Sequence, residues 1–460
     1  MLLGTLFERF AQETPVCVAV RTLMEWALAP EALDELFGRT AVRQYERELL
    51  FSTCVDLMAG VVCRTHRSVN AAYQVSAAVV GVSVQSLYDK LAGIEPQTSA
   101  ELVRHTARRL EPVIRQLNGA LPAVVPGYRM KILDGNHLTR TQRRLKPLRN
   151  VAAGPLPGQT LVVLEPALGL VTDVVCGEDG HAQERSLMGP ILGAVGAGEL
   201  WVADRNFCTT GILCGIASRG GSFAIRQHAS TLSWERETVP RPTGRCGTGE
   251  LSEQELWLED GEGGTLMVRR VTLVLDKPTQ DGETGIHVLT NLPESVTPVR
   301  VMEVYRTRWR VEGLFQDVTT ILKCELNTLG YPKAALFGFR VALVASNVFG
   351  ALRASLRSVH GAKTVEEKVS AYYLADELAG LFRGMMVALP AEEWEPVRTW
   401  DLPRLAKWLK TLAKKVRLPR FQKHSRGPKK PRQRRTRFTR NKHISTAKLL
   451  AAEKHNKPDP

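Results

Sequence analysis

A segment near residue 310 carries the residues whose types and spacing most clearly suggest chemistry. Placed on a helix at about 100° per residue, Tyr305, Arg308 and Glu312 fall on one face, and Lys323 continues that face. The opposite face is apolar. A helix with an apolar back packs that back on a core, so its polar front must face a cleft or a ligand. A carboxylate between cationic side chains suits a site that binds phosphate groups and a metal ion.

Two aspartates follow short predicted strands earlier in the chain. The strand 130–133 ends at Asp134, and the buried strand 200–203 ends at Asp204. Mg²⁺ prefers oxygen ligands and keeps several waters, so three carboxylates from separate elements are enough to bind it. Two such ions, roughly 3.5 to 4 Å apart, can activate the attacking oxygen and stabilise the leaving oxygen in phosphodiester cleavage. We therefore predict that Asp134, Asp204 and Glu312 are catalytic and bind two Mg²⁺ or Mn²⁺ ions.

The hydrophobic pattern predicts the elements that position these residues. Residues 126–227 alternate strands with helices, and residues 286–350 add a strand and the helix of Glu312, which opens at Thr297-Pro298. This order is typical of an α/β core in two parts. Between the two parts, the polar and glycine-rich residues 228–285 predict a mainly β insertion.

The two ends of the chain differ from this centre. Residues 1–125 predict an all-helical N-terminal domain, in which 82–91 is either a DNA-recognition helix or an ordinary amphipathic helix. Residues 351–413 predict a helical C-terminal region. Residues 414–460 hold 17 Lys and Arg against two acidic residues, whereas the rest of the chain is neutral overall. This charge predicts a disordered basic arm that binds the phosphates of nucleic acid; the alternatives are binding to an anionic membrane and a role in solubility alone.

The acidic residues also sit in motifs that resemble a known family. Asp134-Gly135-Asn136-His137, Ala203-Asp204-Arg205-Asn206-Phe207 and Tyr305-x2-Arg308-x3-Glu312 are similar to the three acidic motifs of DDE transposases. The particular resemblance is to the insertion-sequence-four group, whose signature is Tyr-x2-Arg-x3-Glu-x6-Lys, and it covers about residues 125–350. It implies an RNase H-like catalytic core that carries the β insertion. It also implies cut-and-paste transposition, with metal-dependent nicking, hairpin formation and opening, and joining to target DNA.

One residue departs from that signature. Thr319 occupies the position of the signature lysine and cannot supply its charge. Lys323 lies one helical turn further, about 20° around the axis and roughly 16 Å along it from Glu312. We expect Lys323 to replace part of the phosphate contact; the alternative is that this position makes no phosphate contact.

Several other residues are candidates for DNA contacts. Arg140, Arg143 and Arg144 either hold DNA or form an exposed basic loop. Trp234, in the predicted insertion, either stacks on a base near the hairpin or packs against the protein. Trp309 is expected to pack within its helix.

The resemblance implies double-stranded DNA as partner, both element ends and target, bound by a homodimer on paired ends. No apolar run looks long enough to span a bilayer, and eight scattered cysteines without a Cys-x-x-Cys pair favour reduced thiols. We expect a cytoplasmic, nucleoid-associated protein. Two other interpretations stay open: a non-catalytic DNA-binding protein derived from a transposase, and a metal-dependent nuclease that does not transpose.

Overall fold

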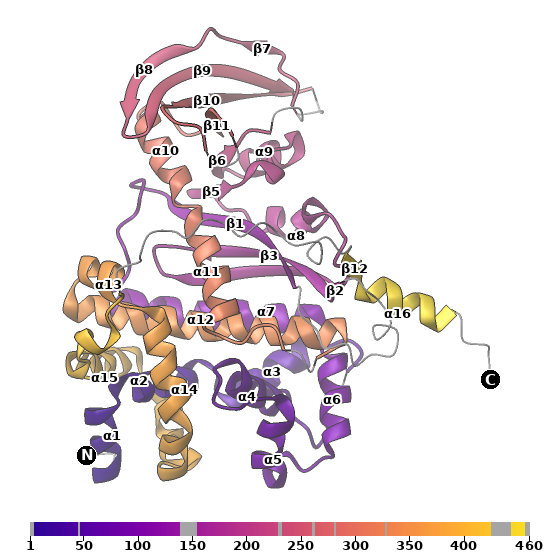
Figure 1. Cartoon of the computed structure of the whole chain (residues 1–460), viewed down its shortest axis with the longest axis vertical. Coiled ribbons are helices and arrows are strands. Elements are labelled where there is room, and N and C mark those ends of the chain that lie inside the picture. Colours follow the sequence, from indigo (N-terminus) through magenta and orange to yellow (C-terminus); the bar gives the residue numbers. More distant parts are fainter. Residues whose placement is uncertain are drawn as a thin grey trace.

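The structure is a computed structural model that describes residues 4–44, 47–138, 154–228, 232–259, 263–279, 282–326, 329–424 and 443–455. A large mixed sheet forms its upper and middle parts in Figure 1, and most of the helices lie below that sheet. The sheet has ten strands in the order β4-β3-β1-β5-β6-β11-β10-β9-β7, with β8 paired to β9.

The first half of the sheet is the predicted α/β core. β1 pairs antiparallel with β3 and parallel with β5, β3 pairs antiparallel with β4, and β5 pairs parallel with β6. These five strands are β1 (Arg129–Leu138), β3 (Gly158–Glu165), β4 (Leu170–Gly177), β5 (Glu199–Ala203) and β6 (Ser222–Arg226). β3 and β4 form a hairpin that turns at Gly169, and the φ of +72° there suits glycine. A 3₁₀ turn, η2 (Glu184–Leu187), precedes α8 (Met188–Gly193), and α9 (Thr210–Ala217) joins β5 to β6.

The predicted insertion extends the same sheet. β11 pairs antiparallel with β6, and β10 pairs antiparallel with both β11 and β9. Its strands are β7 (Arg236–Glu237), β8 (Arg241–Cys246), β9 (Gly249–Glu259), β10 (Thr265–Leu275) and β11 (Gly285–Thr290). The insertion is therefore held to the core by backbone hydrogen bonds, and Figure 1 shows its strands curving over the top of the molecule.

Helices from both ends of the chain share one core under the sheet. The described residues before β1 are helical and contain no strand: α1 (Thr5–Glu13), α2 (Pro15–Ala27), α3 (Pro30–Thr40), α4 (Phe51–Val62), α5 (Val69–Val80), α6 (Val84–Gly93) and α7 (Pro96–Gln116). The helices near the other end are α12 (Pro332–His360), α13 (Ala362–Lys368), α14 (Ala371–Ala388) and α15 (Leu402–Lys415). Side chains from both sets belong to one continuous hydrophobic cluster.

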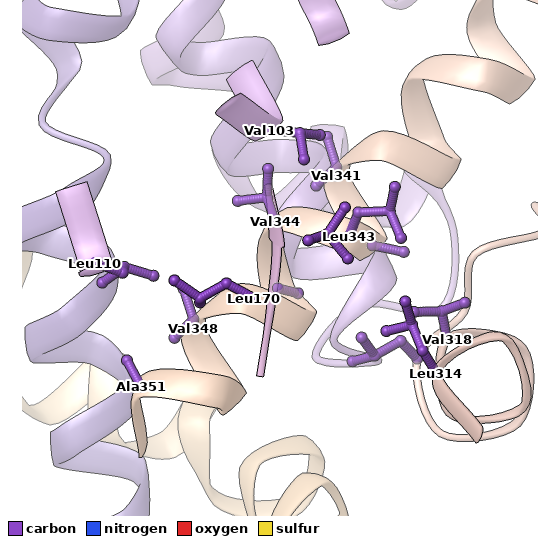
Figure 2. Packing of buried hydrophobic residues seen from close by; sticks show 14 of the residues in the cluster. Val103, Leu110, Leu170, Leu314, Val318, Val341, Leu343, Val344, Val348 and Ala351 are labelled. Carbon is purple, nitrogen blue, oxygen red and sulfur yellow. The ribbon is translucent and has the colours of Figure 1, made fainter. Parts of the chain in front are cut away.

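Helix α12 is the axis of that cluster. It runs beside α7 beneath the sheet in Figure 1 and contacts α2, α4, α7, α15 and β4. Figure 2 shows Val348 of α12 between Leu110 of α7 and Leu170 of β4. The buried Asn347 side chain accepts a hydrogen bond from Val171 N at 2.7 Å and donates one to Val171 O at 2.9 Å. Because β4 is at the edge of the sheet, Asn347 pairs backbone groups that no strand reaches.

The expectation that no apolar run could span a bilayer is wrong for length alone. Among the described residues, α12 is long and apolar enough, but 89% of its most apolar window is buried inside the protein. Burial of this kind is typical of a core helix, so the length and composition of α12 are weak evidence for a membrane span.

The prediction of a disordered tail is wrong for the parts that the structure describes. Lys414 and Lys415 end α15, β12 (His443–Ser445) pairs parallel with β2 (Gly154–Leu156), and α16 (Thr446–His455) follows. Lys448 Nζ lies 2.9 Å from Asp179 Oδ2. Backbone pairing and this ion pair order a segment that net charge alone suggested would be solvated.

The contact between α12 and the β3–β4 turn gives a first prediction. A Cβ at Gly350 would meet the backbone carbonyl oxygen of Gly169. We expect Gly350→Ala to lower the free energy of unfolding by about 1–3 kcal/mol, because neither backbone can move freely. In α14, a Cβ added at Gly380 would meet no atom within 4 Å beyond its own stretch of helix, so Gly380→Ala should instead raise stability by up to about 1 kcal/mol. Urea unfolding of both variants checks this, and equal effects would contradict it.

Candidate active site

The two aspartates lie where β1 and β5 separate. Asp134 was expected at a strand end but lies inside β1, which continues to Leu138 because β3 pairs with it that far. The pairing of β1 with β5 stops at Ile132 and Val202, so β5 no longer covers Asp134. Asp204 directly follows the last residue of β5, as predicted.

Strand alternation points both aspartates to the same face of the sheet. Met130 and Ile132 of β1 and Leu200 and Val202 of β5 belong to the cluster that contains α11 and α12. Side chains two residues apart share a face, so Asp134 and Asp204 continue these two rows toward α11. Leu133 and Trp201 point the other way, into a second cluster with α8 and α9.

The helix of Glu312 is broken where the sequence predicted one long helix. α10 (Pro298–Arg306) and α11 (Trp309–Thr320) are joined through Thr307 and Arg308. In the junction, Arg308 N donates to Tyr305 O and Val311 N donates to Arg308 O. This three-residue spacing tightens the turn but keeps residues three apart on one side. Tyr305, Arg308 and Glu312 therefore still share a face, and Val311 and Val318 are fully buried on the back.

Arg308 connects two of the predicted catalytic carboxylates. Its Nη1 lies 3.2 Å from Asp134 Oδ2 and its Nη2 lies 2.6 Å from Glu312 Oε1. The Arg308 side chain is 14% exposed, and Asp134 is 16% exposed. The guanidinium was expected to grip a DNA phosphate. In this structure it neutralises carboxylates.

Asp134 sits in an unfavourable place for a negative charge. Burial raises its pKa to about 7, Arg308 opposes this shift, and the charges of Asp204 and Glu184 add to it. A divalent cation would compensate this charge more fully than one guanidinium, so the donor set fits a hard metal ion.

The described residues do not form a preassembled metal cage. No group of three or more His, Cys, Asp or Glu side chains among them is arranged to hold an ion. Arg308 lies between Asp134 and Glu312 and occupies both carboxylates. The chemistry of a metal site is present, but its ligands do not converge on one point.

Tyr305 joins the site to basic residues that the sequence did not single out. Tyr305 is 9% exposed, and its hydroxyl group interacts with Arg226 at the end of β6. Arg226 pairs with Glu283 at 2.6 Å, and Glu283 also pairs with Arg205, next to Asp204. A cavity of about 440 Å³ lies here, lined by Arg205, Arg226, Gln227, His228, Arg270, Glu283, Gly285 and His287. The sequence could have indicated Arg226 as a site residue, because it lies at the end of the strand beside β5.

Lys323 is not on the helix of Glu312, so the predicted geometry is wrong. α11 ends at Thr320, because Leu322 and Cys324 turn into the core. Lys323 N donates to Val62 O, and its Nζ donates to Arg67 O at 2.6 Å. Its side chain is tied to the N-terminal helices.

The remaining candidates have different positions. Trp234 is partly buried and packs against the cluster of α8 and α9. Trp309 was expected to pack but is 66% exposed, with the Arg308 guanidinium 5.7 Å from its ring centroid. Arg140, Arg143 and Arg144 lie outside the described residues.

The raised pKa of Asp134 predicts a pH-dependent stability. Between the usual carboxyl pKa and about 7, the folded protein retains a proton that the unfolded chain releases, so stability falls as pH rises through this range. The side chain of the Asp134→Asn variant does not titrate. Its free energy of unfolding relative to wild type should therefore rise by an amount on the order of 2–4 kcal/mol as the pH increases from about 4 to about 8. Urea unfolding with a chelator present measures this difference. A difference that does not change with pH would show that Asp134 ionises normally.

The central segment of the chain is similar to a known protein family. Residues 159–345 match the family model described as the transposase DDE domain. This segment is less than half of the chain, and it includes Asp204 and Glu312 but begins after Asp134. No curated protein matches the chain.

A cryo-EM structure of a piggyBac transposase synaptic complex with hairpin DNA is similar at a TM-score of 0.36 and 13% identity, over 85% of this chain and 86% of that chain. That score is too low to assign the fold. The family match stands without it: residues 159–345 of this chain are similar to a transposase DDE domain.

Proposed function

We propose that this protein is a DNA transposase that cleaves and joins phosphodiester bonds with Asp134, Asp204 and Glu312. The observation that carries this proposal is that Arg308 pairs with both Asp134 and Glu312, while Asp204 follows the adjacent strand β5 on the same face of the sheet. The match to a transposase DDE domain, which spans two of the three residues, supports it independently.

The strand order supports an RNase H-like core. Three antiparallel strands, β4, β3 and β1, continue into two parallel strands, β5 and β6. This order is expected of that fold, with the insertion strands added beyond β6. The acidic residues lie on β1, directly after β5 and on a helix that follows the insertion.

Each side chain of the site has a role in the proposed reaction. Two Mg²⁺ or Mn²⁺ ions bound by the three carboxylates would activate the attacking oxygen and stabilise the leaving oxygen. Arg308 offers a planar fork of donors that matches a phosphate as well as a carboxylate. Tyr305 and Arg226 lie beside it, and the cavity lined by Arg205 and Arg270 extends this basic surface along the strand ends.

The finer features of the proposal follow the resemblance to the insertion-sequence-four group. We propose cut-and-paste transposition through hairpin ends, with a homodimer binding paired transposon ends and target DNA in the cytoplasm. Trp309, exposed next to Arg308, offers a face on which a base could stack. Trp234 is partly buried, which favours packing over a base contact.

The carboxylates give the test of this function. We expect Asp134→Asn, Asp204→Asn and Glu312→Gln each to lower metal-dependent cleavage of a duplex carrying a transposon end by at least about 10³-fold. Binding of the same duplex should change little, because the apolar back of α11 and the strand pairing remain. Cleavage is measured with Mg²⁺ and with Mn²⁺, and Asp173→Asn on β4 serves as the control carboxylate. Cleavage near the wild-type rate in any two of the three variants would sink the assignment.

The basic run in the tail gives a separate test of DNA binding. Five Lys and Arg residues lie in the segment Lys429-Lys430-Pro431-Arg432-Gln433-Arg434-Arg435. Replacing them with Gln should reduce the slope of log affinity against log salt by several units, about 0.9 for each phosphate that is no longer neutralised. Substitution is better than truncation, because truncation would also remove β12 from its pairing with β2. An unchanged slope would show that these Lys and Arg residues do not contact DNA phosphates.

A further inference from the structure

We propose that Glu184, which no acidic motif includes, is a positioning residue for the two catalytic aspartates. Its carboxylate holds Asn206, beside Asp204, and packs against Gly135, beside Asp134. This inference rests on the proposed function, because it explains how the site holds its shape during DNA cleavage.

The first observation is a chain of hydrogen bonds that ends at Asp204. Asn206 Nδ2 donates to Glu184 Oε2 at 2.5 Å, and Asn206 N donates to Asp204 Oδ1 at 2.8 Å. Asp204 thus caps the 3₁₀ turn η3 (Arg205–Phe207), and Glu184 holds the second residue of that turn. Through this hydrogen bond, Glu184 fixes the turn that directs Asp204.

The second observation is the close approach of Glu184 to Gly135. A Cβ at residue 135 would meet the carboxylate carbon and Oε1 of Glu184. Gly135 is not among the glycines with positive φ, so its conformation does not require glycine. Space explains it: glycine leaves room for the Glu184 carboxylate against the backbone that follows Asp134.

The third observation is that Glu184 is itself held by a buried group. Gln159 of β3 is 1% exposed. In the amide orientation that satisfies both of its polar atoms, its nitrogen donates to Ala182 O and its oxygen accepts from Glu184 N at 3.2 Å. Because β3 pairs with β1 along Asp134, the anchor of Glu184 belongs to the same sheet as the aspartates.

These contacts support the site from the face opposite to α11. Residue 135 points to the side of α8, whereas Asp134 points to the side of Arg308. Arg308 contacts Asp134 on one face, and Glu184 fixes the neighbouring backbone on the other. Displacement of a catalytic group by about 1 Å can cost about 10²-fold in rate, so removing this support should be visible in the chemical step.

The test compares two changes at Glu184. Glu184→Ala removes the acceptor of Asn206, whereas Glu184→Gln keeps an acceptor oxygen of the same reach. We expect Glu184→Ala to lower the single-turnover cleavage rate about 10²-fold, and Glu184→Gln to stay within about fivefold of wild type. DNA affinity without metal and the melting temperature should be close to wild type in both. Gln183→Ala, an exposed neighbour whose side chain makes no capping hydrogen bond, is the matched control.

A second pair of variants tests the contact with Gly135. Gly135→Ala should displace the carboxylate and reduce the rate in the wild-type background. In the Glu184→Ala background it should have little further effect, because the group it collides with has been removed. Effects that multiply independently would show that Gly135 has another role.

The outcomes separate this inference from the proposed function. If Glu184→Ala cleaves at the wild-type rate while Asp204→Asn is inactive, the inference fails and the function stands. Loss of activity in Glu184→Gln equal to that in Glu184→Ala would mean that the charge itself is needed, which also overturns the positioning role. Full activity of Asp204→Asn would overturn the proposed function.

Discussion

The ion pairs of Arg308 with Asp134 and Glu312 are the interaction on which the candidate site depends. They connect a strand in the middle of the sheet to a helix that returns from the far end of the insertion. Three carboxylates facing one another across this gap would repel, and the buried Asp134 already has a raised pKa. One guanidinium, 14% exposed, pairs with a carboxylate from each of the two elements. Metal ions would have to compete with this guanidinium for the carboxylates. DNA phosphates would have to compete with the carboxylates for the guanidinium.

This ion-paired arrangement is possible because the helical core fixes α11 in place. Leu314 and Val318 of α11 and Leu343 of α12 are all part of the cluster shown in Figure 2. α12 in turn packs on α7 and on β4, the edge strand whose backbone Asn347 completes. The N-terminal and C-terminal helices are therefore parts of one support for the α11 face. The contact of α12 with the β3–β4 turn, although distant, is therefore connected to the site through packed side chains.

Much of the site was predictable because it depends on local periodicity. Strand alternation places Asp134 and Asp204 on one face, and spacings of three and four residues keep Tyr305, Arg308 and Glu312 together even across a broken helix. The prediction for Lys323 failed because it continued a helix by periodicity alone, whereas burial of Leu322 and Cys324 ends the helix at Thr320. Arg226 and Glu184 were not predicted, because strand pairing and a loop bring them from other segments. Order in the tail was missed because β12 needs β2, which is almost 300 residues earlier.

Crystallography with Mn²⁺ would test the central claim most directly, because anomalous scattering locates the ion without assumptions about activity. Crystals of the wild-type protein grown with Mn²⁺ should show an anomalous peak among Asp134, Asp204 and Glu312, with the Arg308 guanidinium moved away from at least one of its two carboxylate partners. The peak should disappear in Asp204→Asn. A structure at saturating Mn²⁺ with no peak at these carboxylates, and Arg308 still paired with Asp134 and Glu312, would contradict the assignment of this site as the catalytic centre.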